Sequence, residues 1–120
     1  MTILRNVGDQ GEELVVAHLL KNKYTILARN YTQKCGEIDV IAQKGNRIFF
    51  VEVKTRLKAG SFDLAEVVNY TKQRRIIKTA QFYLVKNKCE DRDCQFDVAL
   101  IEPRDGIAEL TYIPNAFVVE

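Results

Sequence analysis

Asp39, Glu52 and Lys54 are the residues of this sequence whose types and spacing could do chemistry. Glu52 and Lys54 lie two residues apart in segment 47–54, which is rich in β-branched and aromatic residues and therefore typical of a β-strand. Because side chains alternate between the two faces of a strand, Glu52 and Lys54 share one face and the neighbouring valines point to the other. An acid and a lysine at this spacing are common as a solvated ion pair, so this pattern alone does not define a catalytic site.

The position of Asp39 follows from the turn at Gly45-Asn46, which fixes the register of a predicted hairpin. A two-residue loop at these positions places Asp39 directly opposite Glu52 on the neighbouring strand. A loop of three to five residues would stagger the two carboxylates but leave them neighbours. The sequence therefore predicts an acidic pair on one face of the hairpin.

Two carboxylates that face each other across a hairpin need a proton or a cation between them. Facing Cβ atoms lie only ~4.5–5.5 Å apart, and like charges at that distance destabilise the sheet. Mg²⁺ favours one or two carboxylates together with waters and a substrate phosphate, which is what Asp39 and Glu52 offer. Lys54, on the same face, would orient or deprotonate an attacking water and hold the phosphate. The alternative is a structural ion pair with no metal.

The elements that must position these residues can be read from the hydrophobic pattern. Apolar residues at three- and four-residue spacings predict helices, and short β-branched runs predict strands. We expect helices over residues 9–22, from Leu64 onward and over 72–87, and strands over 24–27, 38–43, 47–54, 95–102 and 107–113. Pro103 is expected to stop the fourth strand and Pro114 to begin an apolar tail. This order predicts an α/β fold, a mixed sheet with helices packed on it, in one domain over residues 1–120.

Composition and charge exclude several classes of protein. The chain has 120 residues, of which 47% are hydrophobic and 28% charged, so a disordered or collagen-like chain is excluded. No apolar run reaches the ~18 residues of a membrane span, and the first residues lack the pattern of a signal peptide, so a cytoplasmic protein is expected. Cys35, Cys89 and Cys94 have no zinc-site spacing and are expected to be reduced thiols.

The net charge of +2 hides a basic middle segment. Residues 44–88 contain eleven Lys or Arg and three Asp or Glu, a local charge of +8, and the rest of the chain carries −6. Such a segment suits a polyanion, because phosphate contacts supply most non-specific affinity for nucleic acid. Arg74 and Arg75 stand four and three residues before Lys78, so some of these cations share a helix face and could follow a phosphate backbone. Scattered solubilising charges are the alternative.

A set of short motifs over nearly the whole chain resembles the YraN family of small bacterial proteins. The chain carries GxxGE at residues 8–12, NY at 30–31, GEIDVIA at 36–42, FVEVKTR at 50–56, EVV at 66–68, KQRR at 72–75 and FDV at 96–98. That family is similar to the archaeal Holliday junction resolvases and to the PD-(D/E)xK nucleases. The resemblance implies a restriction-endonuclease-like fold, with a mixed central sheet flanked by helices.

The resemblance also implies roles for individual residues. Asp39 and Glu52 match the acidic ligands of Mg²⁺ or Mn²⁺, Lys54 matches the motif lysine, and Glu12 matches a helix glutamate that completes the site. Glu12 could instead simply favour the helix N-terminus. We expect nucleic acid to contact Arg56, Lys72, Gln73, Arg74, Arg75 and Lys78. His18 stands where the family has an aromatic residue and is interpreted as helix packing.

The leading hypothesis is a divalent-metal-dependent endonuclease that hydrolyses phosphodiester bonds in DNA, with Asp39, Glu52, Lys54 and Glu12 as its catalytic residues. DNA is expected rather than RNA, with branched or junction DNA as the substrate suggested by the resemblance. A non-catalytic nucleic-acid-binding protein that keeps the fold is the main alternative. An interaction protein that docks on an acidic partner is the third. A homodimer is suggested by resemblance only, with the tail at residues 117–119 as its contact.

Overall fold

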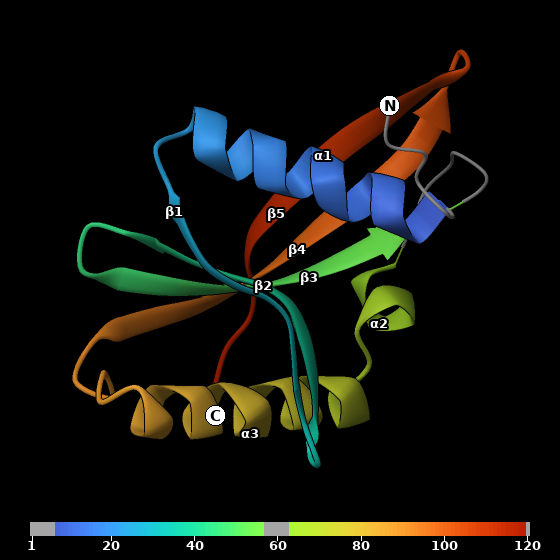
Figure 1. The fold of residues 1–120 in the computed structure, drawn as a ribbon. Helices are drawn as coiled ribbons and strands as arrows, with labels where there is room; N and C mark the ends of the chain where they lie inside the picture. Colours follow the sequence, from blue (N-terminus) through green and yellow to red (C-terminus); the bar gives the residue numbers. More distant parts are fainter. Residues whose placement is uncertain (1–6, 57–62, 120) are drawn as a thin grey trace.

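The computed structural model describes residues 7–56 and 63–119, in which a twisted sheet separates two long helices (Figure 1). The strands are β1 (Thr25–Gln33), β2 (Gly36–Lys44), β3 (Arg47–Thr55), β4 (Asp93–Arg104) and β5 (Ile107–Phe117), and the helices are α1 (Val7–Lys21), α2 (Leu64–Val67) and α3 (Tyr70–Lys86). Every element expected from the sequence is present in the expected order. No helix within the described ranges is long and apolar enough to cross a membrane.

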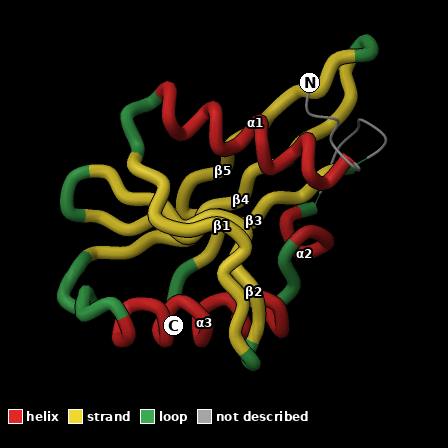
Figure 2. The backbone as a smooth tube through the Cα atoms, viewed as in Figure 1, coloured by secondary structure: helices red, strands yellow, loops and turns green. Residues whose placement is uncertain are grey.

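The five strands lie in the sheet in sequence order, β1-β2-β3-β4-β5. β3 and β4 are parallel, because α2 and α3 connect them, and the other three pairs are antiparallel hairpins. α1 covers one face of the sheet and α3 the other (Figures 1 and 2). The expected mixed sheet flanked by helices is therefore confirmed.

Each face of the sheet has its own hydrophobic core. On the α1 side, Val15 and Leu19 pack on strand residues that include Val40, Val51 and Ala99. On the α3 side, the buried residues of the helix pack on alternate strand positions; this core includes Ile38, Ile41, Phe50, Ile76, Ile77, Ala80, Tyr83, Phe96, Val98 and Leu100. Because a parallel strand between two helices is covered on both faces, β3 and β4 read as nearly continuous apolar runs.

Pro103 does not stop β4 as the sequence suggested, because the strand continues to Arg104. The last pair that β4 makes with β3 joins Ile101 to Thr55, so Pro103 lies beyond the end of β3. Among the residues that the structure describes, no neighbouring strand on that side requires the N–H that proline lacks. Proline is therefore tolerated in this part of β4.

Pro114 does not begin a tail either, since β5 runs on to Phe117 at the edge of the sheet. The register between β4 and β5 shifts between Phe96 and Val98, so the proline falls in an irregular stretch of an edge strand, where it can be accommodated. Phe117 is buried and stacks on Phe96, with ring centroids 5.1 Å apart. Of the three residues predicted to form a dimer contact, only Val118 and Val119 are therefore exposed, and the dimer itself stays a prediction.

Asp97 fastens this irregular part of β5 to β4. Its buried carboxylate accepts hydrogen bonds from the Tyr112 hydroxyl at 2.5 Å, the Gln95 amide at 2.9 Å and the Asn115 main-chain N–H at 2.9 Å. Burial, and then the hydrogen bond to Asp97, raise the pKa of Tyr112, so the hydroxyl keeps its proton and donates. Asp97 belongs to the FDV motif, and these contacts assign it a structural role.

Asp97→Asn is expected to lower the free energy of unfolding by about 1–2 kcal/mol, because three bonds to a charged acceptor become bonds to a neutral one. Urea unfolding at pH 7 measures this difference. Asp93→Asn is the matched control, since the Asp93 side chain is 78% exposed and its substitution should change stability by less than about 0.5 kcal/mol. Equal effects of the two substitutions would contradict the structural role of Asp97.

Two smaller expectations concern the cysteines and His18. Cys35, Cys89 and Cys94 form no disulfide among the described residues, and their reduced state stays a prediction. His18 packs against the ring of Tyr112, with ring centroids 5.4 Å apart, as expected of a helix-packing residue.

Candidate functional site

Asp39 and Glu52 lie together where β2 separates from β3. The pairing between these strands follows the predicted register from Lys44 with Arg47 as far as Val40 with Val51. At the next position the Asp39 side chain turns to β3, and its Oδ2 accepts a hydrogen bond from the Val53 main-chain N–H at 2.8 Å. A carboxylate oxygen thus takes the place of a main-chain acceptor, which fixes Asp39 beside Glu52.

The separation of β2 from β3 has a visible cause in the packing of the hairpin formed by β1 and β2. The tip of this hairpin runs beyond the sheet to α3 (Figure 2). Gly36 approaches α3 so closely that an added Cβ would lie 3.1 Å from the Thr79 hydroxyl and 3.4 Å from the Cβ of Arg75. Cys35 also contacts Thr79, with 3.3 Å between Sγ and Oγ1. Contact with α3 therefore holds β2 away from β3 and opens a space beside Asp39.

Glu52 is a carboxylate in an unfavourable environment. Its side chain is only 10% exposed; Oε1 lies 3.2 Å from Lys72 Nζ on α3 and Oε2 is buried without a hydrogen-bond partner among the described residues. Burial, and then the charge of Asp39 and a hydrogen bond with it, together raise the pKa of Glu52 to about 8, against the opposing effect of Lys72. A second cation near Oε2 would relieve this situation.

A cleft of about 420 Å³ opens beside the acidic pair. The strands contribute Asp39 and Glu52 to it, and the first two turns of α3 contribute Lys72 and Arg75. The lining is completed by Gly36, Glu37, Asn69, Thr71 and Ile76. The cleft therefore has acidic groups on the sheet side and basic groups on the helix side, as a site for a cation together with a phosphate would need.

The donor set fits a hard divalent cation that keeps some of its own waters. The described residues contain no group of three or more His, Cys, Asp or Glu side chains that could hold a metal. The two carboxylates of Asp39 and Glu52 are what Mg²⁺ ordinarily takes from a protein, whereas a closed protein cage requires more ligands. The buried Oε2 of Glu52 supports this fit, because it faces no hydrogen-bond donor among the residues described.

Lys54 and Glu12 lie further from the cleft than the acidic pair. Lys54 is exposed on β3, one alternation beyond Glu52 on the same strand face, ~7 Å along the strand. Glu12 lies on α1, with its Oε1 3.9 Å from Arg29 on β1. Neither residue lines the cleft. The structure thus brings two of the four predicted catalytic residues together.

The predicted nucleic-acid contacts divide into two groups. Arg56 lies 3.8 Å from Glu102, and Gln73 donates a hydrogen bond to the Val68 carbonyl at 3.0 Å, so both hold the fold together. Lys72 contacts Glu52, with 3.2 Å between Nζ and Oε1. Only three of the six predicted contacts are exposed, and all three lie on α3: Arg74, Arg75 and Lys78.

The arrangement of sheet and helices is a restriction-endonuclease-like fold. The chain is similar in structure to Hjc, a Holliday junction resolvase from Archaeoglobus fulgidus, with a TM-score of 0.60 over 91% of this chain and 73% of that one. The two sequences are 19% identical, so this likeness shows the fold alone. It confirms the fold that the motifs implied.

This chain belongs to the uncharacterised protein family UPF0102, whose model matches residues 11–101. It is 41% identical over 114 residues to a UPF0102 protein of Geotalea uraniireducens, covering 94% of this chain and 90% of that protein. A UPF0102 protein of Symbiobacterium thermophilum is 42% identical over 114 residues, covering 94% and 97%. The resemblance to the YraN family is thereby confirmed. The matched segment includes the acidic pair and Lys54.

Proposed function

We propose that residues 1–120 form a single-domain, divalent-metal-dependent endonuclease that hydrolyses phosphodiester bonds in DNA. The proposed substrate class is branched or junction DNA, and the proposed location of the protein is the cytoplasm. Asp39 and Glu52 hold Mg²⁺ or Mn²⁺ at the end of the β2–β3 ladder. A bound divalent cation would stabilise the negative charge that develops on the phosphate during hydrolysis. Glu12 stays a prediction of the family resemblance, and the metal proposal does not depend on it.

Lys54 and the helix cations supply the rest of the proposed chemistry. The Lys54 ammonium, on the face of β3 that carries Glu52, orients the attacking water and contacts the phosphate at the reacting centre. Arg75, on the opposite wall of the cleft, binds a neighbouring phosphate of the same strand. Lys72, whose Nζ lies 3.2 Å from Glu52 Oε1, would be available to the substrate phosphate if a divalent cation neutralised that carboxylate.

The observation that carries this proposal is the state of Glu52. A buried carboxyl group with a pKa raised to about 8, beside a second carboxylate and with one oxygen lacking a donor among the described residues, is costly to a fold. Titratable groups that lie in a cleft and have a strongly shifted pKa are found most often at functional sites. A metal site accounts for the cost, because the cation would pair with the otherwise unsatisfied oxygen.

A second candidate is a nucleic-acid-binding protein that keeps the nuclease fold without cleaving. The contact between Lys72 and Glu52 at 3.2 Å favours it, because a protein cation already neutralises one carboxylate of the acidic pair. This candidate predicts DNA binding that is indifferent to divalent metal. A homodimer is compatible with either function and stays a prediction.

Calorimetric titration of Mg²⁺ and Mn²⁺ tests the proposal. Wild-type protein is expected to bind metal, and more tightly in the presence of a non-cleavable branched DNA duplex, whereas Asp39→Asn should bind at least about tenfold more weakly. Asparagine keeps an oxygen for the Val53 N–H, so the substitution removes the charge and preserves the fold. Asp93→Asn, with an exposed carboxylate at the other end of the β3–β4 ladder, should bind metal like wild type. Absence of metal binding in every mixture would contradict the nuclease mechanism and favour the second candidate.

A further inference from the structure

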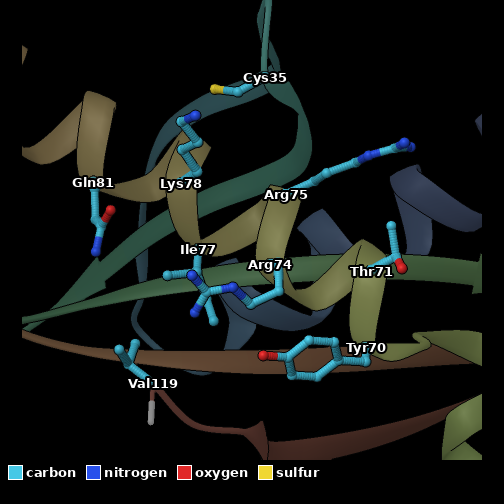
Figure 3. A pocket seen from close by; sticks show the side chains of 9 residues that line it. All are labelled: Cys35, Tyr70, Thr71, Arg74, Arg75, Ile77, Lys78, Gln81 and Val119. Carbon is cyan, nitrogen blue, oxygen red and sulfur yellow. The ribbon is translucent and has the colours of Figure 1, made fainter.

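A second hollow, of about 790 Å³, lies on the outer side of α3 (Figure 3). Tyr70, Arg74 and Val119 lie along one side of it, and Lys78 and Cys35 lie across from them. The Tyr70 side chain is 65% exposed. The hollow therefore combines an open aromatic ring with long cationic side chains.

The residues that give this face its character follow a regular spacing along α3. Tyr70, Arg74, Lys78 and Phe82 recur every four residues, so each lies one turn from the next on neighbouring parts of the helix surface. Phe82, at the far end, is 47% exposed and lines an adjoining hollow with Lys78 and Lys34. Two exposed aromatic rings thus stand at the ends of a row whose middle members are cations. We call this row the α3 stripe.

The charge around the α3 stripe has one sign. Neither of the two hollows described above has an Asp or Glu among its described lining residues, whereas Lys34, Arg74, Arg75 and Lys78 all contribute to them. A polyanion is the partner that this surface complements. A neutral or basic protein surface would meet uncompensated positive charge.

The first hollow adjoins the acidic cleft. Thr71 and Arg75 line both, so they form the boundary between them. In Figure 3 the Arg75 side chain extends away from Arg74 and Lys78. A nucleic-acid strand that follows the α3 stripe would therefore pass Arg75 and reach Asp39 and Glu52.

We propose that the α3 stripe binds an unpaired strand of nucleic acid, with bases stacked on Tyr70 and Phe82 and phosphates held by Arg74 and Lys78. Cations alone would follow a duplex equally well, but exposed aromatic rings have no bases to stack on in a closed duplex. The row from Tyr70 to Phe82 spans ~18 Å along the helix, the length of roughly five stacked nucleotides. Resting on the proposed nuclease function, this inference makes the substrate a DNA with a single-stranded arm beside the scissile bond.

Fluorescence anisotropy with a labelled twelve-nucleotide oligothymidine and with a blunt duplex of the same length tests this inference, in buffer with EDTA so that no metal is bound. Tyr70→Ala and Phe82→Ala are each expected to weaken binding of the single strand at least about fivefold and to change duplex binding less than about twofold. Tyr70→Phe should bind the single strand like wild type, because the ring is retained. Arg74→Ala should weaken both complexes and reduce the salt dependence of single-strand binding by about 0.7 in the log–log slope.

Val85→Ala is the control for loss of an exposed apolar side chain, since Val85 is 63% exposed on α3 and lines none of these hollows. It should leave both affinities unchanged. If Tyr70→Ala lowered the affinity for the single strand and for the duplex equally, the inference would be overturned. An unchanged affinity for the single strand would overturn it as well. Failure of both oligonucleotides to bind the wild-type protein would also overturn it and leave the surface to a different polyanion.

These results can be separated from the fate of the proposed nuclease activity. The binding experiment contains no metal and requires no cleavage, so Asp39→Asn should bind the single-stranded oligonucleotide at least as tightly as wild type. Preserved stacking on Tyr70 in a protein that binds no metal would support the α3 stripe and contradict the nuclease. Metal binding that requires Asp39, together with an unchanged single-strand affinity after Tyr70→Ala, would support the nuclease and contradict the α3 stripe.

Discussion

Glu52→Gln is expected to be more stable than the wild-type protein in alkaline solution, with an advantage that grows by roughly 3 kcal/mol between pH 5 and pH 8. The cause is the raised pKa of Glu52. In the unfolded chain this carboxyl ionises near its ordinary value of 4.5, whereas the native protein holds the proton until about pH 8. Glutamine resembles the protonated acid in size and has no charge to bury.

The sign of this effect follows from the protons that each state binds. Between pH 4.5 and pH 8 the native state holds a proton on Glu52 that the unfolded chain has released, so raising the pH favours unfolding. The contribution of Glu52 to stability is fully present below pH 4.5, is lost as the pH approaches 8, and changes little above that value. Glutamine at this position removes the entire pH dependence that Glu52 causes.

Urea unfolding of both proteins at unit intervals from pH 5 to pH 8, in EDTA, measures the difference. Glu90→Gln is the control, because Glu90 is exposed and its substitution should give a difference that is the same at every pH. A pH-independent difference between Glu52→Gln and wild type would contradict the raised pKa. Added Mg²⁺ should then stabilise wild type at pH 8 and leave Glu52→Gln unchanged, since only the native wild-type protein would bind it.

A gain in stability at a buried carboxylate would have a functional meaning. Stability alone would favour a neutral residue at position 52, so such a gain would support a role for Glu52 that the fold itself does not need. Asp97 is the contrasting case. Asp97 is also buried, but its carboxylate accepts hydrogen bonds from donors on β4 and β5, and its replacement should reduce stability.

The register of the β2–β3 hairpin could be predicted from sequence because local chemistry determines it. A glycine followed by asparagine forms the two-residue turn, and the pairs from Lys44 with Arg47 to Val40 with Val51 follow from it. The point at which β2 leaves β3 could not be predicted in this way. It depends on the contact of Gly36 with α3, some forty residues further along the chain.

The same distinction between local and long-range effects explains the other differences at the site. The contact of Lys72 with Glu52 requires α3 to lie over the end of β3, and neither segment contains a signal for the other. Glu12 is assigned to the site by family resemblance alone and stays a prediction; in the structure its Oε1 lies 3.9 Å from Arg29, a contact that the sequence does not indicate. The structural role of Asp97 could not be predicted from its motif. Two of its donors, Tyr112 and Asn115, lie in a predicted strand and a predicted tail that the sequence does not connect to Asp97.

The two prolines were misinterpreted for a related reason. Proline stops a strand only where a neighbouring strand requires its N–H. Whether such a neighbour exists is a property of the assembled sheet. The pairing of β3 with β4 ends at Ile101, before it reaches Pro103, and β5, which contains Pro114, is an edge strand. Sequence patterns therefore gave the type and order of the elements, and the ends of the strands had to come from the fold.

Lys54→Ala is expected to reduce the rate of DNA cleavage by about 10²- to 10³-fold, the usual cost of removing a donor that stabilises the charge developing at the reacting centre. Affinity for DNA and for Mn²⁺ should change by less than about threefold, because Lys54 is exposed and lies outside the lining of the acidic cleft. Single-turnover cleavage of a branched DNA with a single-stranded arm, together with anisotropy on the same DNA, measures both quantities.

Lys86→Ala removes an equally exposed lysine from the last turn of α3 and should retain the wild-type rate and affinity. A rate that is unchanged by Lys54→Ala would exclude Lys54 from the chemistry while leaving the metal site at Asp39 and Glu52 intact. Parallel losses of rate and affinity would assign Lys54 to substrate binding. A loss of rate alone would mean that the lysine acts in the transition state, because an interaction made only there lowers the rate without weakening the ground-state complex.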